Sequence, residues 1–343
     1  MSEQTKNDHS FSVTHIHAAH QAIRGVADGT PFVPSPFMSK VCGQEFLLKL
    51  ENMQPIGAFK LRGAYNAVMA LSDDVAGVTC CSTGNHGRGV AFAAAKKGIR
   101  AVICMSSLVP QTKVDGIKAL GAEVKICGTS QDDAFAESLR LVAEEGLIEI
   151  SPFDDPYVIA GQGTIGLEML ETRPDLSTIL VPLSGGGLAA GVAVAAKSIN
   201  PKIKVIGITM DRGAAMHASI AAGHPVEVEE VPSLADSLGG GIGMDNKLSF
   251  PLCSEFIDDT VLVTEEEMRD AMQALYFEDR IVAEGASAVG IAAMLAGKVP
   301  KPSGPIGAIV TGRNVDMTMF HKLMGGEDVQ LGDLTLKGRA YGA

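Results

Sequence analysis

One lysine stands at a position where it could do chemistry. Lys60 follows a turn that contains Pro55 and Gly57, with the aromatic residue Phe59 directly before it. The residues after Lys60 predict a helix over about 61–71. A lysine at such a loop-to-helix junction is either a solvated charge at a helix start or an amine that forms a Schiff base with a carbonyl compound.

A second stretch with chemical potential is the Ser-Gly-Gly-Gly turn at 184–187. It lies between a predicted strand at 178–183 and a predicted helix at 188–199. Glycines allow a ligand to approach the backbone closely, and the free N–H groups of a helix start attract anions. The turn has neither the lysine of a Walker loop nor the pattern of a dinucleotide site. It is therefore either a tight turn or a static phosphate site.

Two further polar turns follow predicted strands. The turn at 82–86 comes after the strand 78–82, and the turn at 311–314 comes at the end of the strand 307–312. Their hydroxyl, amide and N–H groups either cap a helix or hold a substrate carboxylate. Because ligands in open α/β sheets bind beyond the carboxyl ends of the strands, we expect these turns to meet at one site.

The predicted elements around these turns alternate between strand and helix. Predicted strands at 46–50, 78–82, 101–105 and 123–127 are each followed by a predicted helix, and the second half repeats the alternation. This order predicts an α/β protein with parallel sheets and right-handed crossovers. The length of 343 residues allows two domains. The polar tail from 328 onward is expected to be a surface segment or disordered.

Composition and charge exclude several function classes. The net charge is -12, which argues against nucleic acid as a partner. The sequence has no apolar run near the roughly 20 residues of a membrane span, and its polar start lacks the apolar core of a signal peptide, so we expect a cytoplasmic protein. The six cysteines match no metal-binding spacing and are expected to be buried reduced thiols.

Taken together, the four stretches resemble the fold-type II pyridoxal-phosphate enzymes, in the branch of threonine/serine dehydratases and serine racemase. The resemblance covers about residues 29–316. It implies a fold like that of the tryptophan synthase β subunit, with two domains that each contain a twisted, mainly parallel sheet flanked by helices. The larger domain would comprise 1–54 and 151–343, and a smaller, mobile domain 55–150. Homodimers are usual in this branch.

The resemblance also implies a role for each stretch. Lys60 would carry pyridoxal phosphate as an internal imine and, once released, remove the Cα proton of the substrate. Thr83 would be a further acid or base on the opposite face, because serine racemase has a serine there. The other cofactor contacts would be Phe59, Asn85, Thr311 and, around the phosphate, Ser184, Gly185, Gly186, Gly187 and Leu188. The substrate α-carboxylate would be bound by Ser82, Thr83 and His86.

Departures from the common dehydratase pattern suggest a substrate with two carboxylates. Ala58 and Ile56 replace the usual Ser and Thr, and the runs around Arg88, Arg212 and Arg313 resemble the hydroxyectoine-utilisation and β-hydroxyaspartate dehydratases. A second carboxylate needs a cationic partner, for which Arg313 is the first candidate. The alternative is that these arginines pair with acids of the protein itself.

The function expected from this resemblance is dehydration of β-hydroxyaspartate to iminosuccinate, which hydrolyses to oxaloacetate and ammonia. The alternative is an L-threonine/L-serine dehydratase or a serine racemase, followed by a β-replacement synthase or a non-catalytic cofactor-binding protein. Racemase-like members hold a cation, but the matching positions here are Thr209 and Ala215. Asp211 or backbone carbonyls could substitute, so Mg²⁺ or another divalent cation stays an open expectation.

Overall fold

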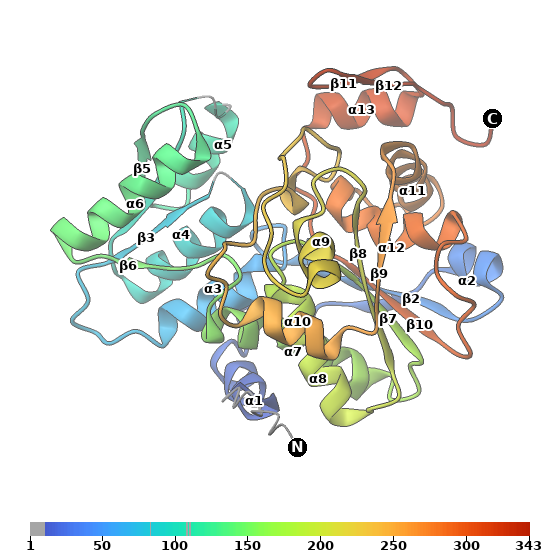
Figure 1. Ribbon diagram of the computed structural model, residues 1–343, viewed down its shortest axis with the longest axis horizontal. Coiled ribbons are helices and arrows are strands. Elements are labelled where there is room, and N and C mark those ends of the chain that lie inside the picture. The colour runs from blue at the N-terminus through green and yellow to red at the C-terminus, as the bar shows by residue number, and fades with distance from the viewer. Residues whose placement is uncertain (1–10, 83, 108, 110) are drawn as a thin grey trace.

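Two separate sheets, both mainly parallel, organise the chain (Figure 1). The computed structural model describes residues 11–82, 84–107, 109 and 111–343. Segments from both ends of the chain form a six-stranded sheet, and the segment between them forms a four-stranded sheet, coloured cyan to green in Figure 1. The expected α/β architecture with two flanked sheets is confirmed.

The larger sheet pairs a strand from the start of the chain with one from near its end. Its order is β1-β2-β10-β7-β8-β9, and every neighbouring pair is parallel except β1 and β2. The carboxyl ends of β2 and β10 therefore lie side by side. The strands are β1 (Phe32–Pro34), β2 (Phe46–Leu50), β10 (Ile306–Val310), β7 (Thr178–Pro182), β8 (Lys204–Met210) and β9 (Asp259–Val263).

Helices cover both faces of this sheet, which explains the continuous apolar runs of its central strands. On β7, Ile179 and Val181 pack into one hydrophobic cluster, whereas Leu180 points into another. The first cluster includes α1 (Val13–Ala22), α7 (Pro156–Thr172), α8 (Gly187–Ile199), α9 (Ala215–Ala222) and α10 (Ser249–Phe256). The second includes α2 (Pro36–Cys42), α11 (Glu265–Phe277), α12 (Gly285–Leu295) and α13 (Met317–Gly325).

The smaller sheet is wholly parallel and has the order β5-β4-β3-β6. Its strands are β3 (Val78–Cys81), β4 (Ala101–Met105), β5 (Glu123–Ile126) and β6 (Ile148–Glu149). One face packs on α3 (Lys60–Met69), α4 (Asn85–Lys97) and α5 (Gln111–Lys118), and the other packs on α6 (Gln131–Glu145). The turns with chemical potential thus begin helices of both sheets.

Two short 3₁₀ helices and a hairpin complete the described elements. The 3₁₀ helices are η1 (Glu51–Met53) and η2 (Asp236–Leu238), and the hairpin joins β11 (Val329–Leu331) to β12 (Leu334–Leu336). The hairpin lies beside α13 (Figure 1). Val329, Leu331 and Leu336 are buried while the residues between them are partly or fully exposed, so this part of the tail is an ordered surface segment and not disordered. None of the helices in the described ranges is long and apolar enough to cross a membrane.

Candidate active site

The turn before Lys60 is hydrogen-bonded to the end of β10. The backbone N–H of Phe59 donates to the carbonyl oxygen of Thr311 over 2.9 Å, and the N–H of Arg313 donates to the carbonyl oxygen of Gly57, also over 2.9 Å. Two of the four predicted stretches, far apart in the sequence, are thus in direct contact. The contact fixes the start of α3 to the larger sheet.

Lys60 is the first residue of α3 and has an environment suited to a reactive amine. Its Nζ donates to the carbonyl oxygen of Pro152 over 2.6 Å and lies 5.5 Å from the centre of the Phe59 ring. The whole residue is only half-buried, but the surrounding protein displaces water from the amine and lowers the pKa of Lys60 to about 8. Near neutral pH, a larger fraction of this amine is therefore unprotonated than for an ordinary lysine. The unprotonated amine is the form that attacks carbonyl groups and accepts protons.

Asn85 has a fixed side-chain orientation. Its Nδ2 donates to Oε1 of Glu284 over 2.9 Å, and its Oδ1 accepts from Nδ2 of Asn314 over 2.6 Å. The carbonyl end of the amide therefore faces Asn314, and one N–H of Nδ2 is left for a ligand. Nδ2 of Asn314 also donates to the carbonyl oxygen of Ile56, which ties this network to the Lys60 turn.

Glu284 is a member of the site that the sequence did not reveal. Burial raises the pKa of its carboxyl group to about 7, against the opposing effect of the hydrogen bond from Asn85. Its backbone N–H donates to the carbonyl oxygen of Gly312 over 3.1 Å, which holds the start of α12 against the end of β10. The available signal was weak: one acid directly before a helix of small and apolar residues.

Thr311 lies at the end of β10 with a buried hydroxyl group. Its Oγ1 is 2.9 Å from Oγ of Ser287 on α12, and Ser287 also exchanges hydrogen bonds with the backbone of Gly312. The side chain expected to contact a pyridine nitrogen is thus positioned by a second hydroxyl group.

The glycine turn is shaped by an aromatic neighbour. A Cβ atom on Gly185 would lie 2.3 Å from Cδ1 of Phe153, so a larger residue does not fit. Gly186 has a φ of 93°, in the left-handed region, and caps α8. Ser249 donates to the carbonyl oxygen of Gly185 over 2.7 Å, while Leu188 is buried in the first turn of α8. The free N–H groups of that turn suit an anion such as a phosphate.

One segment after β6 connects Lys60, the glycine turn and His86. The carbonyl oxygen of Ile150 lies 2.7 Å from Nε2 of His86. Two residues later, the carbonyl oxygen of Pro152 accepts the hydrogen bond from Nζ of Lys60. Phe153 packs on the glycine turn, and the carboxylate of Asp154 accepts from three backbone N–H groups at the start of α10. No pattern in the sequence predicted this positioning role.

The turn after β3 lies at the start of α4, at the carboxyl edge of the smaller sheet. The hydroxyl of Ser82 accepts from the N–H of Gly84 over 3.4 Å, and His86 is buried. Thr83, expected as an acid or base, lies outside the described residues. The structure therefore brings together Lys60, Phe59, Asn85, His86, the glycine turn and Thr311.

Two of the three additional arginines donate to backbone carbonyl oxygens, and the third lies against a helix of the smaller sheet. Arg313 is exposed, and its Nη1 donates to the carbonyl oxygen of Asn52 over 2.6 Å. Arg212 donates to the carbonyl oxygen of Pro232 beside a cavity of about 470 Å³, and Arg88 lies over Gly116 of α5. The Arg313 side chain also lies against Gly57 of the Lys60 turn, and its expected contact with a second carboxylate stays a prediction.

The positions expected for a cation carry no carboxylate. Thr209 is buried within β8, which extends one residue past the predicted strand, and Ala215 begins α9. Among the described residues, no group of three or more His, Cys, Asp or Glu side chains could hold a metal ion.

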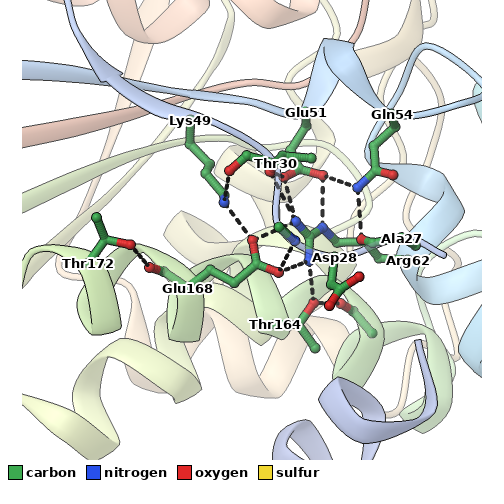
Figure 2. Close-up of polar contacts among 12 residues, drawn as sticks. Ala27, Asp28, Thr30, Lys49, Glu51, Gln54, Arg62, Thr164, Glu168 and Thr172 are labelled. Carbon is green, nitrogen blue, oxygen red and sulfur yellow. Dashed lines mark hydrogen bonds and ion pairs between the residues drawn. The ribbon is translucent and has the colours of Figure 1, made fainter. Parts of the chain in front are cut away.

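A buried ionic cluster lies two residues beyond Lys60. Arg62 is 0% exposed and forms bidentate hydrogen bonds with two carboxylates, Glu51 and Glu168 (Figure 2). Lys49 donates to Glu168 over 2.5 Å, so two cations balance two anions. Further contacts of the cluster are made by Gly29, Thr30, Gln54 and Thr164.

The cluster joins α3 to the larger sheet. Glu51 follows β2, Glu168 lies on α7, and Arg62 lies on α3, so three elements meet at one guanidinium group (Figure 2). Burial alone would raise the pKa of Glu168, but Arg62 and Lys49 lower it to about 2. The carboxylate of Glu168 therefore stays ionised at physiological pH. Residues two apart on a helix point about 200° apart, so Arg62 anchors the side of α3 away from Lys60.

Known proteins with similar sequences identify the family of this chain. Residues 23–312 match the family model of pyridoxal-phosphate dependent enzymes. The chain is 52% identical to a Sinorhizobium fredii protein that carries the provisional name of threonine dehydratase, over 92% of this chain and 96% of that one. It is 39% identical to the catabolic L-threonine dehydratase of Escherichia coli, over 93% and 97% of the two chains.

Solved structures with the same fold include a serine racemase. The maize enzyme superposes with a TM-score of 0.86 at 34% identity, over 92% of this chain and 97% of that one. The fold and the matched sequence define a fold-type II pyridoxal-phosphate enzyme. The chain belongs to the family of pyridoxal-phosphate dependent enzymes, and its neighbours within that family are threonine dehydratases and serine racemases.

Proposed function

We propose that this protein is a deaminating dehydratase that converts L-threonine or L-serine to a 2-oxo acid and ammonia. The observation that carries the proposal is the desolvated amine of Lys60, held by Pro152 and joined through Phe153 to the glycine turn. The relatives named threonine dehydratases support the choice of substrate, since they match almost the whole chain.

The residues of the site fit pyridoxal phosphate. They provide an amine of lowered pKa, a glycine turn at a helix start, an oriented amide and a buried hydroxyl: Lys60, the turn at 184–187, Asn85 and Thr311. When bound, the cofactor draws electrons away from the substrate Cα and makes its proton acidic.

The protein's own groups then bind the substrate and move protons. Lys60 is the general base that removes the Cα proton, because its amine is partly unprotonated near neutral pH. The N–H groups at the start of α4, with Ser82, hold the α-carboxylate. Asn85 contacts the cofactor ring through its remaining N–H group. We retain Thr83 as the proposed acid or base on the face opposite Lys60.

An uncharged side chain on the substrate agrees better with the site than a second carboxylate. Arg313 and Arg212 each donate to a backbone carbonyl, and Arg88 lies over α5. A buried carboxylate without a cationic partner is costly, so β-hydroxyaspartate would be a poor substrate in this arrangement.

We further propose that the protein forms a homodimer. Within each subunit, residues 55–150 would move as a smaller domain.

The test is a comparison of kcat/KM for L-threonine, L-serine and β-hydroxyaspartate, with 2-oxo acid and ammonia as measured products. We expect L-threonine or L-serine to be preferred. A clear preference for β-hydroxyaspartate would overturn the proposed substrate, and release of the opposite enantiomer without ammonia would indicate a racemase. An Arg313→Met variant is the matched control and should leave threonine turnover unchanged.

A further inference from the structure

His86 lies in the first turn of α4, and its ring is fixed at one nitrogen. Nε2 is 2.7 Å from the carbonyl oxygen of Ile150. A carbonyl oxygen can only accept, so Nε2 carries the proton, and Nδ1 of the neutral ring is an acceptor. Burial and the nearby charge of Lys60 lower the pKa of His86 to about 3, so the ring stays neutral at physiological pH.

Nδ1 is a buried acceptor without a partner in the described part of the chain. His86 is 3% exposed, and Nδ1 makes no hydrogen bond to any described residue. Buried polar atoms in native proteins are nearly always paired, so each exception needs an explanation. An acceptor left open beside the free N–H groups of a 13-residue helix is suited to a ligand that carries both a donor and an anionic group.

His86 and Lys60 are neighbours within the site. Their acceptors, the carbonyl oxygens of Ile150 and Pro152, are two residues apart on one segment. The charge of Lys60 is one of the two causes of the lowered pKa of His86. A substrate whose Cα proton is within reach of Lys60 therefore lies close to the ring of His86.

The chemistry of an amino acid limits which group can bind Nδ1. The α-carboxylate has no proton to donate, and its charge would repel the nitrogen lone pair. The ring thus cannot bind the carboxylate, which is left to the N–H groups of α4. The α-amino group is engaged with the cofactor. The β-hydroxyl group of serine or threonine is the donor that remains.

We propose that Nδ1 of His86 accepts a hydrogen bond from the β-hydroxyl group of the substrate and is a specificity-determining contact. This inference rests on the proposed function, because it assumes a β-hydroxy amino acid. It replaces the expected role of the His86 side chain as a carboxylate contact. The bond would hold the hydroxyl oxygen in a fixed direction as it leaves, and an amino acid that lacks the hydroxyl would leave Nδ1 unpaired.

The experiment uses the holoenzyme and two ligands that differ by one hydroxyl group. α-Methyl-L-serine and 2-aminoisobutyrate both lack a Cα proton, so Lys60 cannot deprotonate them and binding is measured without turnover. Their inhibition constants against L-threonine turnover are compared in the wild type, His86→Leu and His86→Gln. Glutamine keeps an acceptor oxygen and is the conservative variant.

We expect the wild type to prefer α-methyl-L-serine by roughly 10-fold or more. His86→Leu should abolish that preference, and His86→Gln should retain part of it. Equal inhibition of the wild type by the two ligands would overturn the inference, and this result does not depend on whether His86→Leu folds. An undiminished preference of His86→Leu for α-methyl-L-serine would also overturn it. Failure of the proposed function would instead appear as absence of ammonia release from L-threonine and L-serine by the wild type.

Discussion

Two groups of buried polar side chains lie around the first turn of α3, and they differ in how fully their hydrogen bonds are satisfied. In the cluster around Arg62, each of the two cations is paired with a carboxylate. In the site around Lys60, the amine donates to a neutral carbonyl, Nδ1 of His86 is unpaired in the described structure, and Glu284 has a raised pKa.

The difference separates a structural role from a functional one. A fully paired ionic cluster fixes three elements relative to each other, and its charged groups are paired with one another. Groups that are desolvated without a full set of partners keep free hydrogen-bonding capacity, which a ligand can use. Arg62 and Lys60 are two residues apart on one helix, so the same turn connects the rigid support with the reactive amine.

The largest expected effect is that of Lys60→Ala on activity. Loss of both the cofactor attachment and the general base should lower kcat/KM for L-threonine by roughly 10⁴-fold or more. The fold should be retained, because Lys60 donates one hydrogen bond and takes no part in the ionic cluster. Steady-state kinetics and thermal unfolding measure both effects. Full activity in this variant would show that another group is the base.

The next largest effect should be that of Arg62→Met on stability. Glu51 and Glu168 would lose their shared cation in the core, and breaking a buried ion pair costs about 3–5 kcal/mol. Denaturant unfolding measures this loss. Arg100→Met is the matched control: Arg100 also binds two carboxylates, Glu123 and Glu145, but at the surface, where pairs contribute at most about 1 kcal/mol. Equal losses in the two variants would refute the contrast between the regions.

Glu284→Gln should change how stability depends on pH. The folded protein holds the Glu284 proton more tightly than the unfolded chain, so its contribution is present at low pH and is lost as pH rises from about 4.5 to about 7. The loss is about 3 kcal/mol for a shift of this size. Unfolding free energies at pH 5 and 7.5 should therefore differ less in the variant. Glu149, whose pKa burial also raises to about 7, leaves a residual slope.

The smallest of these effects is expected for Gly185→Ala. The added Cβ atom would collide with the Phe153 ring and displace the glycine turn, a strain of about 1–3 kcal/mol. Cofactor affinity, measured by titration of the apoprotein with pyridoxal phosphate, should fall by roughly 10-fold. Gly98→Ala is a useful control, because a Cβ there meets nothing within 4 Å and only backbone strain remains. Unchanged cofactor affinity in Gly185→Ala would remove the turn from the site.

The sequence predicted the fold class and most of the contacting turns, because both depend on local patterns. Strand–turn–helix alternation with glycine or polar residues at the turns predicts parallel sheets and a site at their carboxyl ends. The hydrogen bonds from the Lys60 turn to Thr311 confirm that these stretches meet. Lys49 and Glu168 are single charges within mainly apolar runs of a strand and a helix, a pattern that could have indicated a buried ion pair.

The parts that could not be predicted depend on long-range geometry. The separation of two residues between Arg313 and Thr311 in the sequence does not determine where the Arg313 side chain lies. In the structure it is exposed and donates to the carbonyl oxygen of Asn52. Glu284 contacts Asn85 only because the N-terminal ends of α12 and α4 lie next to each other in the fold. The hairpin of β11 and β12 has strands of three residues each, too short for a clear period-two pattern.

The role of Lys60 is tested by identifying the lysine that carries the cofactor. The holoenzyme is reduced with borohydride and digested, and the peptide bearing a pyridoxyl group is located by mass spectrometry. We expect modification of Lys60, whose amine is desolvated, and none of Lys49, which is paired with Glu168. A pyridoxyl group on any other lysine, with Lys60 unmodified, would show that Lys60 does not hold the cofactor.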